Sequence, residues 1–234
     1  TPAFHTATLT LDADRTHALR RLARTAGTTL HAPVLTAYYR ALTTLTGRRD
    51  LVLGMAVTGR DETDRDTHDV FGPFAEAVAL RPANPSEDPL PSPGFDEDLH
   101  RVAAESLTAR ATGPLDLHDL RDLRTPQGLP RTAQFFFTFL DFTALDTPTD
   151  APPPLTLRAD DSATELAPPP LGTDVFLAVR PTPDDGGLSI TARASASAMT
   201  GEQLDSFIEE LTSQLKKNAQ PTNTPTRPSL SPSP

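Results

Sequence analysis

The sequence predicts an α/β fold in which a mixed β-sheet is covered by helices. Short segments with strand patterns alternate with longer segments whose apolar residues recur every three or four positions. Two strand-length runs are almost entirely apolar, which is typical of strands buried on both faces of a sheet. The 234 residues also suffice for one sizeable core. We predict the order β-α-α-β-β-α-β-β-β-β-α.

The N-terminal quarter predicts one strand and two helices. Polar and apolar residues alternate over Thr6–Leu11, the pattern of a half-buried strand. Asp12 is then the predicted N-cap of a helix that ends at Gly27. A second helix begins near Thr29 and ends at Gly47, and its broad apolar face indicates burial on more than one side.

The middle of the chain predicts two strands and a long helix. Asp50–Val57 and Ala75–Leu80 are apolar runs of strand length, separated by the acidic loop Gly59–Asp69. A helix is predicted over Asp96–Ala111, and a short one over Leu115–Leu123. The expected buried face of the long helix consists of Leu99, Val102, Ala103, Ser106 and Leu107.

The C-terminal part predicts strands followed by a closing helix. Gln134–Phe142 carries five Phe in nine residues and is predicted to be a buried strand. Leu155–Arg158 is predicted to be an edge strand. Asp174–Pro181 and Leu188–Ala194 flank a Gly-rich turn and predict a hairpin. The last helix begins at the capping box Thr200–Gln203. Its apolar face consists of Leu204, Phe207, Ile208, Leu211 and Leu215.

Composition sets the boundaries and excludes several functions. Residues 1–217 are predicted to form the folded unit and residues 218–234 a disordered Pro/Thr/Ser-rich linker, which buries too little apolar area to offset its ordering entropy. The net charge of −10 argues against nucleic-acid binding, and no apolar run approaches the ~20 residues of a membrane span. The absence of Cys and of a signal-peptide pattern favours the cytoplasm.

Three stretches, in order, resemble the condensation domains of nonribosomal peptide synthetases. Thr29–Arg60 is similar to the family's segment helix–TG–x–x–D–hydrophobic–G–x–x–x–x–GR. Phe71–Arg81 is similar to the family's G-x-F-V-N-T-x-x-x-R motif. The Phe-rich strand Phe135–Phe142, with the hairpin and helix that follow it, completes the set. The similarity extends over nearly the whole chain, to about Lys217.

This resemblance implies one lobe of a two-lobed acyltransferase of the chloramphenicol acetyltransferase-like superfamily. The family joins an acyl group on one carrier protein to the amine of an acceptor on another, in a tunnel between the lobes. Its catalytic motif H-H-x-x-x-D-G has no counterpart here, because the six His are isolated. We therefore expect the C-terminal lobe, inactive by itself, with no catalytic residue of its own and no metal.

The implied partners follow from the same resemblance. They are the N-terminal lobe, peptidyl and aminoacyl carrier proteins, and adjacent synthetase domains. No cofactor is expected to bind directly, because the phosphopantetheine belongs to the carrier proteins.

The second motif supplies the candidate substrate-binding residues. Gly72 and Phe74 are expected to line the tunnel, although a plain turn and a core aromatic explain them equally well. Glu76-Ala77 stands where Asn-Thr is usual in the family, and a carboxylate there must stay hydrated, pair with a cation or take up a proton. Arg81 is expected either to contact a phosphopantetheine arm or to lie on the surface at a strand end.

Two alternatives stay open. The replacement of Asn-Thr by Glu76-Ala77 also fits a catalytically silent module that docks carrier proteins. The second alternative is that the chain is a lobe of an ester-forming acyltransferase of the same superfamily. The sequence specifies neither the donor and acceptor substrates, nor the stereochemical preference, nor the oligomeric state.

Overall fold

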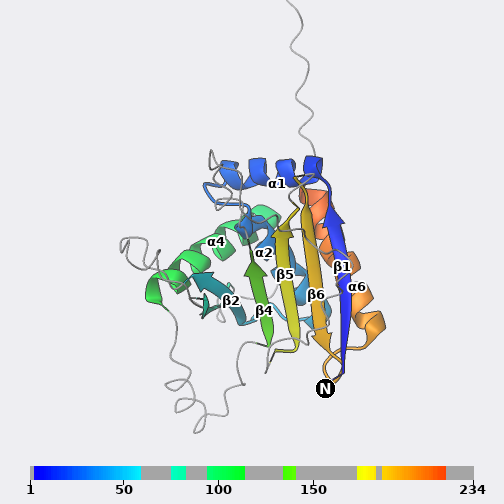
Figure 1. Ribbon diagram of the computed structural model, residues 1–234. Coiled ribbons are helices and arrows are strands. Elements are labelled where there is room, and N and C mark those ends of the chain that lie inside the picture. The colour runs from blue at the N-terminus through cyan, green and yellow to red at the C-terminus, as the bar shows by residue number, and fades with distance from the viewer. Residues whose placement is uncertain are drawn as a thin grey trace, which may run out of the picture.

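The protein is built from a mixed β-sheet with helices packed on one face (Figure 1). The computed structural model describes residues 3–58, 75–82, 94–113, 134–140, 173–182 and 186–219. The strands are β1 (Phe4–Leu11), β2 (Leu53–Thr58), β3 (Ala75–Leu80), β4 (Phe135–Phe139), β5 (Val175–Pro181) and β6 (Leu188–Ser195). The helices are α1 (Ala13–Thr25), α2 (His31–Thr46), α4 (Phe95–Thr112) and α6 (Gly201–Asn218).

The described strands form one six-stranded sheet in the order β1-β6-β5-β4-β2-β3. Strands β2, β4 and β5 are parallel neighbours, whereas β1–β6, β5–β6 and β2–β3 are antiparallel. The predicted mixed sheet is therefore confirmed, and so is the hairpin, because Val175 pairs with Ala194 and Pro181 with Leu188. The parallel strands end at the upper edge of the sheet, across which α1 lies (Figure 1).

Helix α2 lies behind the centre of the sheet, between α4 and α6 (Figure 1). Its buried residues run from Ala32 to Leu42 with one interruption, which confirms the prediction of burial on more than one side. Inside the core, the hydroxyl of Tyr38 donates to the carbonyl oxygen of Val175 at 3.1 Å. The helix ends at Gly47, whose φ of 66° favours glycine.

The predicted caps of α1 and α6 are confirmed. The side chain of Asp12 accepts a hydrogen bond from the backbone N–H of Arg15 at 2.8 Å. At α6, the Thr200 hydroxyl accepts from the N–H of Gln203 at 3.2 Å, and the Gln203 side chain accepts from the N–H of Thr200 at 2.9 Å. These bonds satisfy N–H groups that have no partner inside a helix. Local sequence is therefore sufficient to start both helices.

One predicted face is shifted. In α4 the buried residues include Leu99, Val102, Ser106 and Ala109, but the side chain of Leu107 is 67% exposed. These four positions are spaced by three or four residues and therefore share one side of the helix, whereas Leu107 lies on a different side. The prediction that Leu107 is buried was wrong for this reason.

Several predictions lie outside the described residues. These are the acidic loop Gly59–Asp69, the short helix Leu115–Leu123, the edge strand Leu155–Arg158 and residues 220–234 of the linker. Among the described helices, none has the length and apolar character needed to cross a membrane.

The two faces of the sheet differ. On the helix-bearing face, Met55, Phe137 and Leu177 are fully buried in the core. On the opposite face, the rings of Phe136 and Phe176 stack with their centroids 5.9 Å apart, and the guanidinium of Arg193 lies 5.5 Å from the centroid of Phe176. Because alternate residues of a strand point to opposite faces, the Phe-rich strand β4 supplies aromatic rings to both.

Candidate functional site

The candidate residues Glu76 and Ala77 lie on β3, an edge strand of the sheet. Glu76 is opposite Val57 of β2 and Ala77 is opposite Ala56, and both candidates are exposed. Glu76 shares the helix-bearing face with the buried Val78, so Ala77 points to the other face. The assignment of these residues to a substrate tunnel stays a prediction. The other candidates, Gly72 and Phe74, lie outside the described residues.

Arg81, the last residue of the second motif, forms a bidentate ion pair with Asp50. Its Nε is 2.5 Å from Oδ1 of Asp50, and its Nη2 is 2.6 Å from Oδ2. The backbone N–H of Arg81 also donates to Oε1 of Glu105 in α4 at 3.2 Å. The hydrogen bonds from Arg81 lower the pKa of Asp50, and the carboxylate raises the pKa of Arg81. Asp50 and Arg81, which belong to separate motifs, thus form one contact.

From the sequence alone, Arg81 was expected either to contact a phosphopantetheine arm or to lie on the surface, and its pairing with Asp50 was not predicted. Asp50 precedes β2 and Arg81 follows β3, and the register places Leu53 of β2 opposite Leu80 of β3. An antiparallel pair with that register brings the start of one strand to the end of the other. An antiparallel pairing of the two predicted strands was the available signal, but the register that brings Asp50 to Arg81 comes from the structure.

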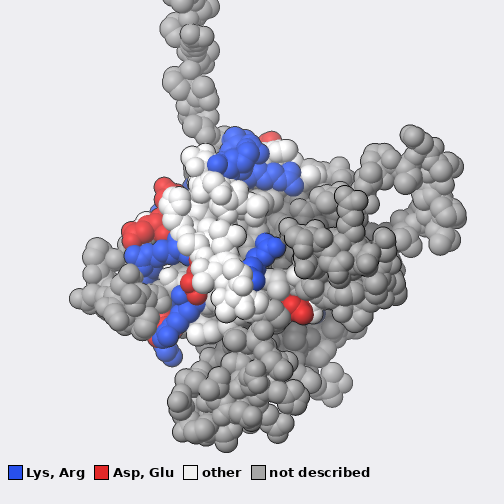
Figure 2. Space-filling model, turned by 90° about the vertical axis from the view of Figure 1, so that its left-hand side faces the viewer, with Lys and Arg blue, Asp and Glu red and all other residues white. Residues whose placement is uncertain are grey.

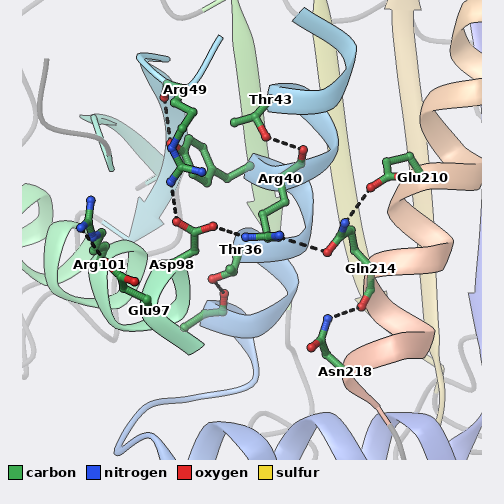
Figure 3. A network of polar contacts seen from close by, with 12 residues as sticks. Thr36, Arg40, Thr43, Arg49, Glu97, Asp98, Arg101, Glu210, Gln214 and Asn218 are labelled. Carbon is green, nitrogen blue, oxygen red and sulfur yellow. Dashed lines mark hydrogen bonds and ion pairs between the residues drawn. The ribbon is translucent and has the colours of Figure 1, made fainter. Parts of the chain in front are cut away.

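A second charge cluster lies between α2, α4 and α6 (Figure 3). Asp98 of α4 is fully buried, with a relative exposure of 0%. One of its carboxylate oxygens is 2.7 Å from Nη2 of Arg49, and the other forms an ion pair with Nη1 of Arg40. The Nε of Arg40 continues the cluster by donating to Gln214 of α6 at 3.1 Å. We refer to Arg40, Arg49, Asp98 and Gln214 as the Asp98 network.

The Asp98 network and the Asp50–Arg81 pair meet in the loop after α2. Arg49 and Asp50 are neighbours, and each pairs with a different element: Arg49 with α4, and Asp50 with the residue after β3. The hydroxyl of Tyr39 donates to the carbonyl oxygen of Arg49 at 2.8 Å, and burial raises the pKa of Tyr39 to about 12. This loop therefore fixes the β2–β3 edge relative to α2 and α4.

His31 lies near the upper edge of the sheet, at the first residue of α2. Its ring meets Phe137 edge-on with centroids 5.1 Å apart and lies 6.1 Å from Phe139. Burial, together with the positive charge of Arg110, lowers the pKa of His31 to about 4, so its imidazole is neutral at pH 7. In the sequence, all six His were noted only as isolated residues, so a special role for His31 was not predicted. No local signal marks its burial, because the Phe-rich strand that it contacts lies far along the chain.

A neutral imidazole can donate one hydrogen bond and accept another. His31 is therefore chemically suited to orienting a polar group at the edge where β4 and β5 end. Within the described ranges, no three His, Cys, Asp or Glu side chains are grouped so that they could hold a metal ion.

The exposed position of the Asp50–Arg81 pair predicts a small energetic coupling. Its side chains are 45% and 39% exposed, so solvent screens their attraction. We expect a double-mutant cycle of Asp50→Asn and Arg81→Gln to give a coupling of about 1 kcal/mol or less in urea unfolding. The exposed pair Glu97–Arg101 is the matched control. A coupling several times larger than that of the control would contradict this expectation.

The whole chain is similar to one protein family. Residues 3–232 match the family described as condensation domain. A relative named as a probable nonribosomal peptide synthetase, CymA of Salinispora arenicola (strain CNS-205), is 29% identical over 198 residues, which are 85% of this chain and 2% of CymA. Bacitracin synthase 1 of Bacillus licheniformis is 44% identical over 63 residues, which are 27% of this chain and 1% of that synthase.

Solved structures share the fold. A condensation domain that mediates chain release from the enacyloxin polyketide synthase aligns with a TM-score of 0.66 and 16% identity, covering all of this chain and 44% of that one. At these identities the likeness concerns the fold. The chain spans a small fraction of the curated relatives and less than half of this solved chain.

Proposed function

Because this chain belongs to the condensation-domain family, we propose that it is the C-terminal lobe of such a domain and contributes to amide-bond formation between carrier-bound substrates. One observation carries the proposal: the solved condensation domain is matched along the whole of this chain, but the match covers only 44% of that domain. The isolated state of all six His in the sequence supports it, since the family's paired-His motif must then come from the other lobe.

In the proposed reaction, a histidine of the N-terminal lobe acts as the general base. It takes a proton from the acceptor amine as that amine attacks the carbonyl carbon of the donor thioester. The amide bond forms, and the donor carrier leaves as a thiol. This lobe contributes orientation, because holding both substrate arms in reacting geometry removes much of the entropic barrier.

The geometry of the β2–β3 edge suits that role. The Asp50–Arg81 pair and the Asp98 network connect this edge to the loop after α2 and to helices α2 and α4. We propose that Gly72, Phe74, Glu76 and Ala77 contribute to the tunnel, with Glu76 on the helix-bearing face of β3 and Ala77 on the opposite face. Since Glu76 is exposed, its carboxylate stays hydrated without a desolvation cost, which favours the tunnel mouth over its interior.

Reconstitution tests the proposal. The purified chain is mixed with an N-terminal condensation lobe that carries H-H-x-x-x-D-G and is supplied from its own gene. An acyl-loaded donor carrier and an aminoacyl-loaded acceptor carrier are the substrates. We expect no amide from the chain alone and a product on the acceptor carrier from the mixture, detected by mass spectrometry. Replacing the second His of the motif by Ala is the control and should abolish the product. Amide formation by the chain alone would refute the proposal.

A second candidate is a catalytically silent docking module. It is favoured by the likeness to the X-domain solved in complex with OxyB from teicoplanin biosynthesis. That alignment has a TM-score of 0.65 and 21% identity, and it covers 93% of this chain and 46% of that one. The same assay separates the two. A silent module would bind a carrier protein but give no amide with an intact N-terminal lobe. A hydroxyl-bearing acceptor in the assay reports the ester-forming alternative.

A further inference from the structure

Helix α1 carries a stripe of basic side chains. Arg20, Arg21 and Arg24 follow His17 at spacings of three, four and seven residues, which places all four on one side of a helix. Arg21 and Arg24 are exposed, and Arg20 is partly buried. Figure 2 shows basic side chains gathered at the upper edge of the molecule, where Figure 1 places α1. We call these four residues the α1 basic stripe.

One carboxylate, that of the exposed Asp14, lies on the same side of the helix, three residues before His17. Among the residues that the structure describes, no ion pair involves Arg20, Arg21 or Arg24. The ion pair that α1 does form, between Asp12 and Arg15, lies away from the stripe around the helix. Like charges four residues apart destabilise a helix by a few tenths of a kcal/mol, roughly 0.2–0.5 per pair. This concentration of positive charge stands out in a chain whose net charge is −10.

We propose that the α1 basic stripe docks a helix of another protein domain, one that presents carboxylates at the same three, four and seven spacing. Charge complementarity at matched spacing is what selects this partner. A membrane is disfavoured because the apolar residues of α1, such as Leu19 and Ala23, are buried in the core and cannot enter a bilayer. RNA, a second anionic partner that the stripe could attract, is included in the test.

This inference goes beyond the proposed function, because it requires binding and no condensation chemistry. A failure of amide formation in reconstitution would leave it standing, and its own failure would leave the lobe assignment untouched. The contact is expected to be weak and sensitive to salt, since exposed charges are screened within about 10 Å at 0.1 M ionic strength.

The test is an NMR titration of the full isotope-labelled chain with a helical peptide. The probe is a stapled alanine-based peptide of about 18 residues, long enough to be helical, with Glu at positions that match the stripe. A control peptide has the same composition, with its Glu residues spread around the helix. We expect the probe to shift the amide signals of α1 and to bind at least fivefold more tightly than the control. Raising NaCl from about 50 to 300 mM should weaken it.

Charge reversal in the protein completes the test. R21E/R24E should weaken probe binding at least fivefold, and R21Q/R24Q should do so to a lesser degree. The matched control is K216E/K217E, two exposed basic residues in the last turn of α6. Equal binding of both peptides, equal weakening by both reversals, or no binding at all would overturn the proposal. So would binding of anionic vesicles or RNA with an affinity equal to that of the probe.

Discussion

Replacing Asp98 by Asn is expected to lower the free energy of unfolding by about 3 kcal/mol. Asp98 is fully buried, and its carboxylate pairs with the guanidinium groups of two arginines whose side chains are only about a fifth exposed, at 21% for Arg40 and 20% for Arg49. Asn keeps the shape of the side chain but removes the negative charge. Two partly buried cations would then face each other without the anion between them, and each has lost part of its hydration.

The size of this effect follows from the asymmetry of buried ion pairs. Forming such a pair gains little, because desolvation offsets most of the attraction, whereas removing one partner leaves the other charge uncompensated. Asp98 also joins three helices, because Arg40 extends the contact to Gln214 of α6 (Figure 3). The loss therefore affects the packing of α2, α4 and α6 together.

Urea or guanidinium unfolding, followed by circular dichroism, measures the difference. The control is Glu97→Gln, one residue earlier in α4, which breaks an exposed pair with Arg101 and should cost about 0.5 kcal/mol or less. An Asp98→Asn protein no less stable than the Glu97→Gln protein would show that the Asp98 network contributes nothing to stability.

Acidification from pH 6.5 to pH 4 is expected to remove up to about 3 kcal/mol of stability through His31. The pKa of His31 is lowered from 6.5 to about 4 in the folded protein. In the unfolded chain the imidazole takes up a proton as the pH falls through 6.5, but the folded state resists protonation until about pH 4. The contribution of His31 is thus fully present above pH 6.5 and is lost between these two values.

The physical cause is the position of the ring. His31 packs against Phe137 and Phe139, and the charge of Arg110 opposes a second positive charge there. The Asp50 carboxylate, whose pKa is lowered from 3.8, loses its contribution at lower pH, so its effect falls below the His31 window. The two groups are therefore separable by pH.

The measurement compares unfolding free energies at several pH values between 4 and 7. A His31→Phe protein keeps an aromatic ring that cannot be protonated, and it should lack most of the slope in this range. His17→Gln, at an exposed position on α1, is the control and should keep the slope of the parent. A His31→Phe protein with an unchanged slope would contradict the assignment.

Much of the fold was predictable because its signals are local. The caps at Asp12 and Thr200, the Gly47 helix end and the hairpin around Gly186 each depend on a few neighbouring residues. Strand β3 was predicted with its observed bounds, Ala75–Leu80. The buried face of α4 was misplaced at Leu107, because the true face includes a charged residue, Asp98, which the predicted face left out.

The candidate site was less predictable, because its features depend on contacts between distant parts of the chain. Asp98 falls on an otherwise apolar stripe, which is a sequence signal for a buried charge in need of a partner. The sequence does not show which residues are its partners, since Arg49 and Arg40 lie 49 and 58 residues away along the chain. Glu76 and Ala77 were both assigned to the tunnel from the motif, yet strand alternation places them on opposite faces.

The sequence by itself determined the α/β class, the start of each capped helix and membership in the condensation-domain family, because periods of two and 3.6 residues and short motifs are written within single segments. Only the tertiary structure decided that Arg81 pairs with Asp50, that Asp98 is held by two arginines, and that His31 is neutral. These properties arise from burial and from the distance between charges, and both exist only once the sheet and its helices have packed together.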